Sequence, residues 1–163
     1  MNNLLNQLQE KAKEKQKQNK QFLNKIKKKP ARDLDKVVSK FDSQVFSTLD
    51  CLSCANCCKT TGPLFTSTDI KRISKFLKLS EKEFEQIYLR EDEDNDYVLK
   101  ELPCSFLDEN NRCFIYEVRP KACREYPHTN QKGFHKFTKE TLHNTFICPA
   151  VFEILEKLKR HYE

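Results

Sequence analysis

The sequence predicts a mostly α-helical fold with a small β-hairpin, organised as one irregular, metal-stapled domain with an N-terminal helical extension. Three observations lead to this prediction. Apolar residues recur at helical spacing in several segments of the 163-residue chain. Gly occurs only twice, which argues against a turn-rich β-barrel or a Gly-rich nucleotide loop. Eight cysteines are present, and four of them fall within eight residues, a density that packing does not explain.

Residues 1–30 are expected to form a basic, Lys/Gln-rich helix that ends at Pro30. They hold nine Lys and two Glu, a charge of +7, whereas the other 133 residues carry 21 basic and 22 acidic groups. Such an arm could bind nucleic acid or an acidic partner. We favour a solvated, partly frayed helix instead, because the arm has no aromatic stacking platform and no regular basic face.

Residues 31–163 are expected to form the cysteine-cluster domain. An amphipathic helix over residues 32–49 leads the chain to Cys51. Two short helices joined near Leu79 come next, the first capped by Ser67 or Thr68 and the second by a capping box. That box is formed by Ser80 and Glu83, and its two residues have the required spacing.

The strongest strand signals lie after the acidic run at residues 91–96, which is expected to be a solvated loop because it lacks the pattern of an EF-hand. The segments "CSFLD" and "CFIY" flank the turn-forming "ENN" and predict a hairpin with Cys104 and Cys113 on its arms. A short helix should begin near Pro120 and end by Pro127, and a last amphipathic helix should start at Pro149.

The chain is expected to lie in the cytoplasm, away from any membrane. Its N-terminus lacks the apolar core of a signal peptide, and no apolar run approaches the length of a membrane span. Clustered cysteines in a reducing compartment indicate metal or redox chemistry more often than disulfides.

The stretch "CLSCANCC" has the spacing of metal ligands. Thiolates favour zinc and iron–sulfur clusters, and a two-residue separation lets neighbouring sulfurs face one ion. Cys57 and Cys58 are adjacent, so their side chains diverge and do not easily bind one tetrahedral ion. The doublet therefore indicates a polynuclear cluster, two adjacent metal sites, or one cysteine that lies next to the ligands without binding the metal itself.

The sequence is compatible with two kinds of metal centre, an iron–sulfur cluster and Zn²⁺. Three cysteines at two-residue spacing with a distant Cys-Pro are typical of a [4Fe–4S] cluster, although the Cys-Pro is much farther away here than in ferredoxins. Eight cysteines also divide into two four-thiolate zinc sites. Cations next to cysteines could donate to the sulfurs, or could be ordinary surface residues: Lys59, Arg112, Arg119, Lys121 and Arg124. Any of the four histidines, His128, His135, His143 and His161, could replace a cysteine, and His128 is the foremost candidate, but eight thiols make no histidine necessary.

The segments "CLSCANCC", "PCSFLDENNRCFIYEVRPKACREYP" and "CP" resemble the YkgJ-type cysteine-cluster family, a zinc- or iron-chelating domain with a CxxCxxCC signature. The resemblance covers roughly residues 48–155 and leaves out the basic extension. It implies a metal-ligand set made of every cysteine in the chain: Cys51, Cys54, Cys57, Cys58, Cys104, Cys113, Cys123 and Cys148.

The expected function is metal binding in a redox, metal-handling or cluster-dependent role. Two alternatives remain open. The flagellin lysine methylases carry a similar cluster, so a protein lysine methyltransferase is one alternative, although they are longer proteins. A zinc-stapled module that binds RNA or an acidic partner through residues 1–30 is the other.

Overall fold

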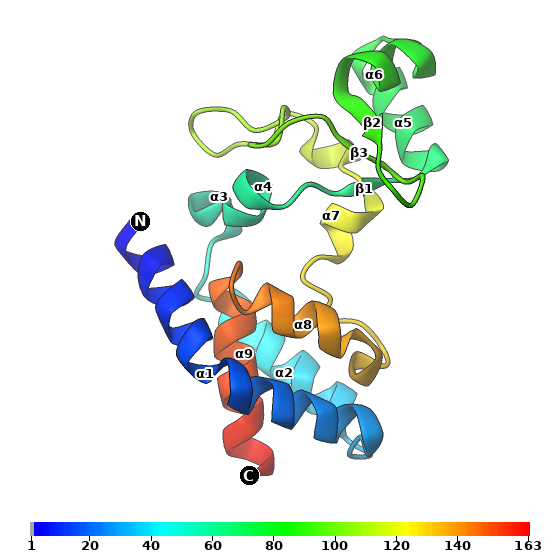
Figure 1. Cartoon of the computed structure of the whole chain (residues 1–163). Coiled ribbons are helices and arrows are strands. Elements are labelled where there is room, and N and C mark those ends of the chain that lie inside the picture. The colour runs from blue at the N-terminus through cyan, green and yellow to red at the C-terminus, as the bar shows by residue number, and fades with distance from the viewer. Residues whose placement is uncertain (1) are drawn as a thin grey trace. The chain divides into compact units, whose positions relative to one another are not determined.

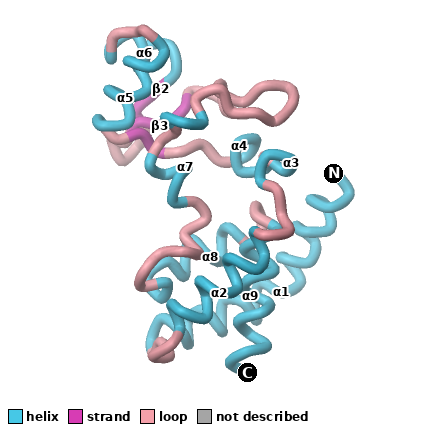
Figure 2. The backbone as a smooth tube through the Cα atoms, turned by 180° about the vertical axis from the view of Figure 1, so that it is seen from behind, coloured by secondary structure: helices cyan, strands magenta, loops and turns pink. Residues whose placement is uncertain are grey.

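The computed structural model describes residues 2–163, with side chains from Gln7 onward. The chain is mostly helical with one small antiparallel sheet, which confirms the predicted fold class (Figures 1 and 2). It forms two compact units, one made of Met1–Asp50 with Pro127–Glu163 and one made of Cys51–Tyr126. None of the helices in residues 2–163 has the length and apolar content that a membrane span requires.

The first unit is helical. Helix α2 packs against α9, and α1 packs against α8 and α9 (Figure 1). Its elements are α1 (Asn2–Lys28), α2 (Leu34–Phe46), the 3-10 helix η2 (Phe134–Phe137), α8 (Thr138–Asn144) and α9 (Pro149–Tyr162). Val38 and Val45 of α2 and Ile154, Leu155 and Leu158 of α9 are buried in its core. The predicted helices over residues 32–49 and from Pro149 are confirmed.

The interpretation of residues 1–30 as a solvated, frayed helix is wrong. Helix α1 buries one face: Leu8, Ala12, Phe22, Leu23 and Ile26. Asn19 lies on that face and accepts a hydrogen bond from the buried Lys159 of α9 at 2.7 Å. The helix is thus part of the core of its unit, because residues three or four apart share a side of a helix. Two statements about residues 1–30 stay predictions. The first is that they bind nucleic acid or an acidic partner, and the second is that they form a region separate from residues 31–163.

The second unit is built on a three-stranded antiparallel sheet in the order β1-β3-β2. Its strands are β1 (Leu64–Phe65), β2 (Leu89–Glu91) and β3 (Tyr97–Leu99), drawn in magenta in Figure 2. The helices are α3 (Cys51–Cys54), α4 (Asn56–Thr60), α5 (Ser67–Leu77), α6 (Glu81–Tyr88), the 3-10 helix η1 (Tyr116–Val118) and α7 (Lys121–Glu125). An aromatic core contains Phe65, Phe84 and Phe106, and the Phe84 and Phe106 rings stack with centroids 6.1 Å apart.

The helix starts in this unit follow capping chemistry. Ser80 and Glu83 form the predicted capping box at the start of α6. At the start of α5, however, the cap is Thr66 and not Ser67 or Thr68. Thr66 is preferred because its capping box is completed by Asp69, which lies three residues later.

The small hairpin lies elsewhere than predicted. Strands β2 and β3 enclose the acidic run, where Asp92 accepts hydrogen bonds from the N–H groups of Asp94 and Asp96, both at 3.0 Å. The segment around "ENN" is a turn held by Asp108, with a single antiparallel bridge between Leu107 and Cys113. The turn was thus predicted correctly, but its arms are too irregular to form strands.

Candidate metal centre

The stretch "CLSCANCC" forms two very short helices, α3 and α4, joined at Ala55. Ala55 has a left-handed backbone with φ of 46°, and its N–H donates to the Cys51 carbonyl oxygen at 2.8 Å. This conformation costs about 1–2 kcal/mol in a residue with a Cβ. It separates the first cysteine pair, Cys51 and Cys54, from the doublet on α4. All eight cysteines of the chain carry thiols.

Four thiols from three segments gather around the second half of the doublet. They are Cys58 on α4, Cys104 and Cys113 on the loop after β3, and Cys123 on α7. In each of the six pairs among them, a negative charge on one sulfur would raise the pKa of the other thiol. We call these four residues the thiol quartet.

Backbone contacts hold the members of the quartet together. The N–H of Cys104 donates to the Cys58 carbonyl oxygen at 2.8 Å, which ties the loop to α4. The bridge between Leu107 and Cys113 closes the loop. Helix η1 begins three residues after Cys113, and its first N–H, from Tyr116, donates to the Cys113 carbonyl oxygen at 3.1 Å. Main-chain contacts therefore connect the segments of three members of the quartet, Cys58, Cys104 and Cys113.

Backbone N–H groups also point at two of the sulfurs. Phe106 and Leu107 donate to the sulfur of Cys104, and Ile115 donates to the sulfur of Cys113. In both cases the residue two positions after the cysteine is a donor. Hydrogen bonds of this kind favour the thiolate over the thiol, which is the form that binds metal.

The thiols of the quartet differ in acidity. Burial, together with the neighbouring thiols, raises the pKa of Cys123 to about 12 and that of Cys104 to about 11, and it raises the pKa of Cys113. The pKa of Cys58 is lowered to about 7, because its hydrogen bond with the Cys57 side chain and the charge of Lys59 outweigh burial. At neutral pH, Cys58 is the member closest to the thiolate state.

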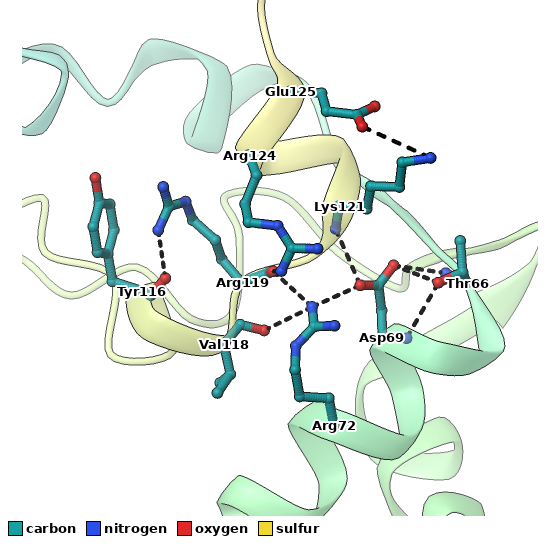
Figure 3. Close-up of polar contacts among 9 residues, drawn as sticks. All are labelled: Thr66, Asp69, Arg72, Tyr116, Val118, Arg119, Lys121, Arg124 and Glu125. Atoms are coloured by element: carbon teal, nitrogen blue, oxygen red, sulfur yellow. Dashed lines mark hydrogen bonds and ion pairs between the residues drawn. The ribbon is translucent and has the colours of Figure 1, made fainter.

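A polar hub fixes the segment that carries Cys123 (Figure 3). The buried carboxylate of Asp69 accepts hydrogen bonds from Thr66, from Arg72 Nη2 at 2.7 Å and from the N–H of Lys121 at 3.1 Å. The same Arg72 nitrogen donates to the carbonyl oxygens of Val118 and Arg119. Helix α5 therefore holds both the end of η1 and the start of α7.

Sequence reasoning did not single out Asp69 or Arg72 as residues of this centre. The signal was present in "TSTD", because a Thr followed three residues later by Asp is a capping pattern. Nothing local to Arg72 indicates its contact with Arg119, which is 47 residues away in the sequence.

The other predicted ligands lie outside the quartet. Cys57 contacts it through its hydrogen bond with Cys58, whereas Cys51 and Cys54 lie on α3. Cys148 belongs to the other compact unit, where it is the N-cap residue of α9. His128, also in that unit, stacks on Phe137 with ring centroids 5.3 Å apart. That Cys51, Cys54, Cys57 and Cys148 bind metal stays a prediction.

The quartet suits a soft metal in its donor chemistry, since four thiolates are the usual ligands of structural zinc and of iron–sulfur clusters. Within the part of the chain that the structure describes, no three His, Cys, Asp or Glu side chains are already arranged as a metal site. Metal binding therefore requires the sulfurs to draw together and to release protons.

Comparison with known proteins places this region in a family. Residues 50–143 match the CxxCxxCC family, which is described as "Putative zinc- or iron-chelating domain". "Uncharacterized protein MJ0661" of Methanocaldococcus jannaschii is 37% identical over 93 residues, which are 54% of this chain and 49% of that protein. The chain thus spans about half the length of this curated relative. No solved structure is significantly similar to the chain.

Proposed function

The chain belongs to the CxxCxxCC family of zinc- or iron-chelating domains, and from this premise we propose that the thiol quartet is its metal-binding centre. Cys58, Cys104, Cys113 and Cys123 supply the ligands. The observation that carries this proposal is the 2.8 Å hydrogen bond from the Cys104 N–H to the Cys58 carbonyl oxygen, which brings the loop of Cys104 and Cys113 to the cysteine doublet. The match to the family covers seven of the eight cysteines and leaves out Cys148.

The metal, zinc or iron, would organise the loop-rich half of the second unit. The quartet lies on two short helices and a loop, so a metal that joins them would add cohesion between these segments. A zinc ion with four thiolates supplies structural cohesion, and an iron–sulfur cluster supplies one-electron redox chemistry as well. We propose a redox or metal-handling role in the cytoplasm, and the methyltransferase alternative stays a prediction.

Cys51, Cys54 and Cys57 are proposed as a second group of ligands. Their two-residue spacing suits three sulfurs that face one ion or one cluster. Cys51 is exposed and the other two are half-buried, so this group is more open to solvent than a closed structural site. The Cys57–Cys58 hydrogen bond connects it to the quartet.

The proposal is tested by purifying the full chain without oxygen and measuring zinc, iron and acid-labile sulfide per chain, together with the visible absorption spectrum. A brown protein with iron and sulfide indicates an iron–sulfur centre, and a colourless protein with zinc indicates a structural one. Protein that contains neither metal, and that takes up neither Zn²⁺ nor Fe²⁺ when these are added, would contradict the proposal.

A further inference from the structure

Helix α1 has a second regular face, on the side opposite the one that is buried in the core of its unit. Side chains three, four or seven residues apart line up along a helix, so the residues of this face fall within about a third of its circumference. Five lysines and two amides occupy it, and all seven are exposed: Lys13, Lys17, Lys20, Gln21, Asn24, Lys27 and Lys28. We call these seven residues the basic stripe. It was not recognised from the sequence, because the buried side of the helix was not known.

The charge of the basic stripe is not offset along the helix. Residues 15–32 hold seven Lys and one Arg and no acidic residue, and the two carboxylates of α1, Glu10 and Glu14, come before them. Among the side chains that the structure describes, none of the five lysines of the stripe forms an ion pair. Lys15, which lies beside the stripe, differs because it pairs with Glu156 of α9 at 2.8 Å. The stripe is therefore a line of cations that is open to an anionic ligand.

The dimensions of the stripe suit an extended polyanion. At a rise of 1.5 Å per residue, the distance from Lys13 to Lys28 along the helix axis is about 22 Å. A nucleic-acid duplex carries about one negative charge per 1.7 Å of its axis, so a helix of this length can face several phosphates at once. The amide groups of Gln21 and Asn24 are further donors that can bind phosphate oxygens.

The stripe contains no apolar or aromatic side chain, and this narrows the class of ligand. Interfaces with proteins depend on apolar or aromatic anchors, and helices that lie in a lipid surface insert apolar side chains. The apolar residues of α1 are buried in its own unit and are not available for either purpose. Single-stranded nucleic acid is bound by stacking on aromatic rings, which the stripe also lacks. Contacts between lysines and phosphates are sufficient, by contrast, for sequence-independent binding of a duplex.

We propose that the basic stripe of α1 binds the phosphate backbone of a nucleic-acid duplex without preference for sequence. The inference does not depend on the proposed metal centre, because α1 and the thiol quartet belong to different compact units.

The test uses the full chain, purified without oxygen, and fluorescent duplexes of about 24 base pairs, long enough to cover the stripe. Fluorescence anisotropy measures the affinity for two unrelated sequences, each as DNA and as RNA. The two sequences should bind with affinities that agree within about twofold, and the logarithm of the affinity should fall against the logarithm of the salt concentration with a slope of about −4.

A variant that neutralises the middle of the stripe tests its role directly. It combines three substitutions: Lys17→Gln, Lys20→Gln and Lys27→Gln. It should bind duplexes at least about tenfold more weakly at low salt, and its salt slope should be smaller by two to three, roughly one for each lost phosphate contact. Glutamine has nearly the helix propensity of lysine, so α1 should remain folded, which circular dichroism checks. If the triple variant does not fold, Lys20→Gln alone should reduce the slope by about one.

The matched control removes the same charge from exposed lysines of α5 and α6. It combines three substitutions: Lys71→Gln, Lys75→Gln and Lys82→Gln. Its affinity should stay within about threefold of the wild type, because these lysines lie outside the stripe. Equal losses in the two triple variants would overturn the inference, because net charge and not the stripe would then govern binding.

Three further results would also overturn the inference. They are the absence of duplex binding at low salt, tighter binding of a single strand than of the duplex, and tighter binding of polyglutamate or of phosphatidylserine vesicles than of the duplex. Zinc and iron are measured in the same samples and report on the metal centre separately. A metal-containing protein that does not bind duplexes contradicts only this inference, and a duplex-binding protein that takes up neither metal contradicts only the proposed function.

Discussion

The carboxylate of Asp69 accepts a hydrogen bond from the backbone N–H of Lys121, which lies 52 residues later in the chain, at 3.1 Å. One side chain on α5 therefore fixes the first residue of α7, two positions before Cys123. Because Asp69 also completes the capping box of α5, the start of one helix and the placement of a candidate ligand depend on the same carboxylate.

Replacing Asp69 with Asn should destabilise the second unit by about 1–3 kcal/mol, since a buried acceptor of four hydrogen bonds is lost or rearranged. Chemical unfolding followed by circular dichroism measures the change. Glu83→Gln alters the equivalent position of the exposed capping box of α6 and should cause a clearly smaller loss. If the two variants lose the same amount of stability, the contacts that Asp69 makes outside its own helix do not contribute to the free energy of unfolding.

The Asp69 carboxylate should also make the free energy of unfolding depend on pH under acidic conditions. Burial raises the pKa of Asp69, but the hydrogen bonds from Thr66, Arg72 and Lys121 outweigh it and hold the pKa below its ordinary value of 3.8. A group with a lowered pKa stabilises the folded state fully above that ordinary value, and the stabilisation is lost as the pH falls through the folded-state pKa. The difference in unfolding free energy between the wild type and Asp69→Asn should therefore be constant above about pH 5 and shrink below pH 4. A difference that grows as the pH falls would contradict this assignment.

Removing the metal should loosen the second unit more than the first. The quartet lies on loops and short helices of residues 51–126, whereas the core of the first unit is formed by long helices. Hydrogen exchange measured with and without a chelator should show faster exchange in residues 104–125 and little change in α2 and α9. Faster exchange that is equal in both units would mean that the metal does not act through the quartet.

Helix α1 should contribute to stability through its buried face. Leu23 is 2% exposed, so Leu23→Ala should cost about 2–5 kcal/mol through lost burial and a cavity. Lys17→Ala, on the exposed side of the same helix, is the matched control and should change stability by less than about 0.5 kcal/mol. If both variants unfold like the wild type, the helix is not part of the folded core.

The sequence predicted most helices because their signals are local. Ser80 and Glu83 mark the start of α6 by chemistry within four residues, and Pro149 marks the start of α9. The buried face of α1 was overlooked because two of its members, Ala12 and Asn19, are not recognised as core residues by hydrophobicity alone. Together with Leu8, Phe22 and Ile26 they complete a regular helical spacing.

The candidate site was predictable in composition but not in arrangement. All eight cysteines stand out by their spacing, yet the choice of Cys58, Cys104, Cys113 and Cys123 as one group depends on contacts between distant segments. The Cys104–Cys58 main-chain hydrogen bond and the Asp69–Lys121 contact set that arrangement, and neither has a local signature. That Arg119 donates to the sulfurs stays a prediction; its contact with the Tyr116 ring and carbonyl oxygen was not anticipated.

The most direct test of the central claim is the amount of zinc and iron bound per chain in single Cys→Ser variants that are purified without oxygen. Substitution of any member of the quartet should abolish or strongly reduce the bound metal. Retention of the metal in Cys104→Ser and Cys123→Ser would contradict the assignment of the quartet as the metal centre.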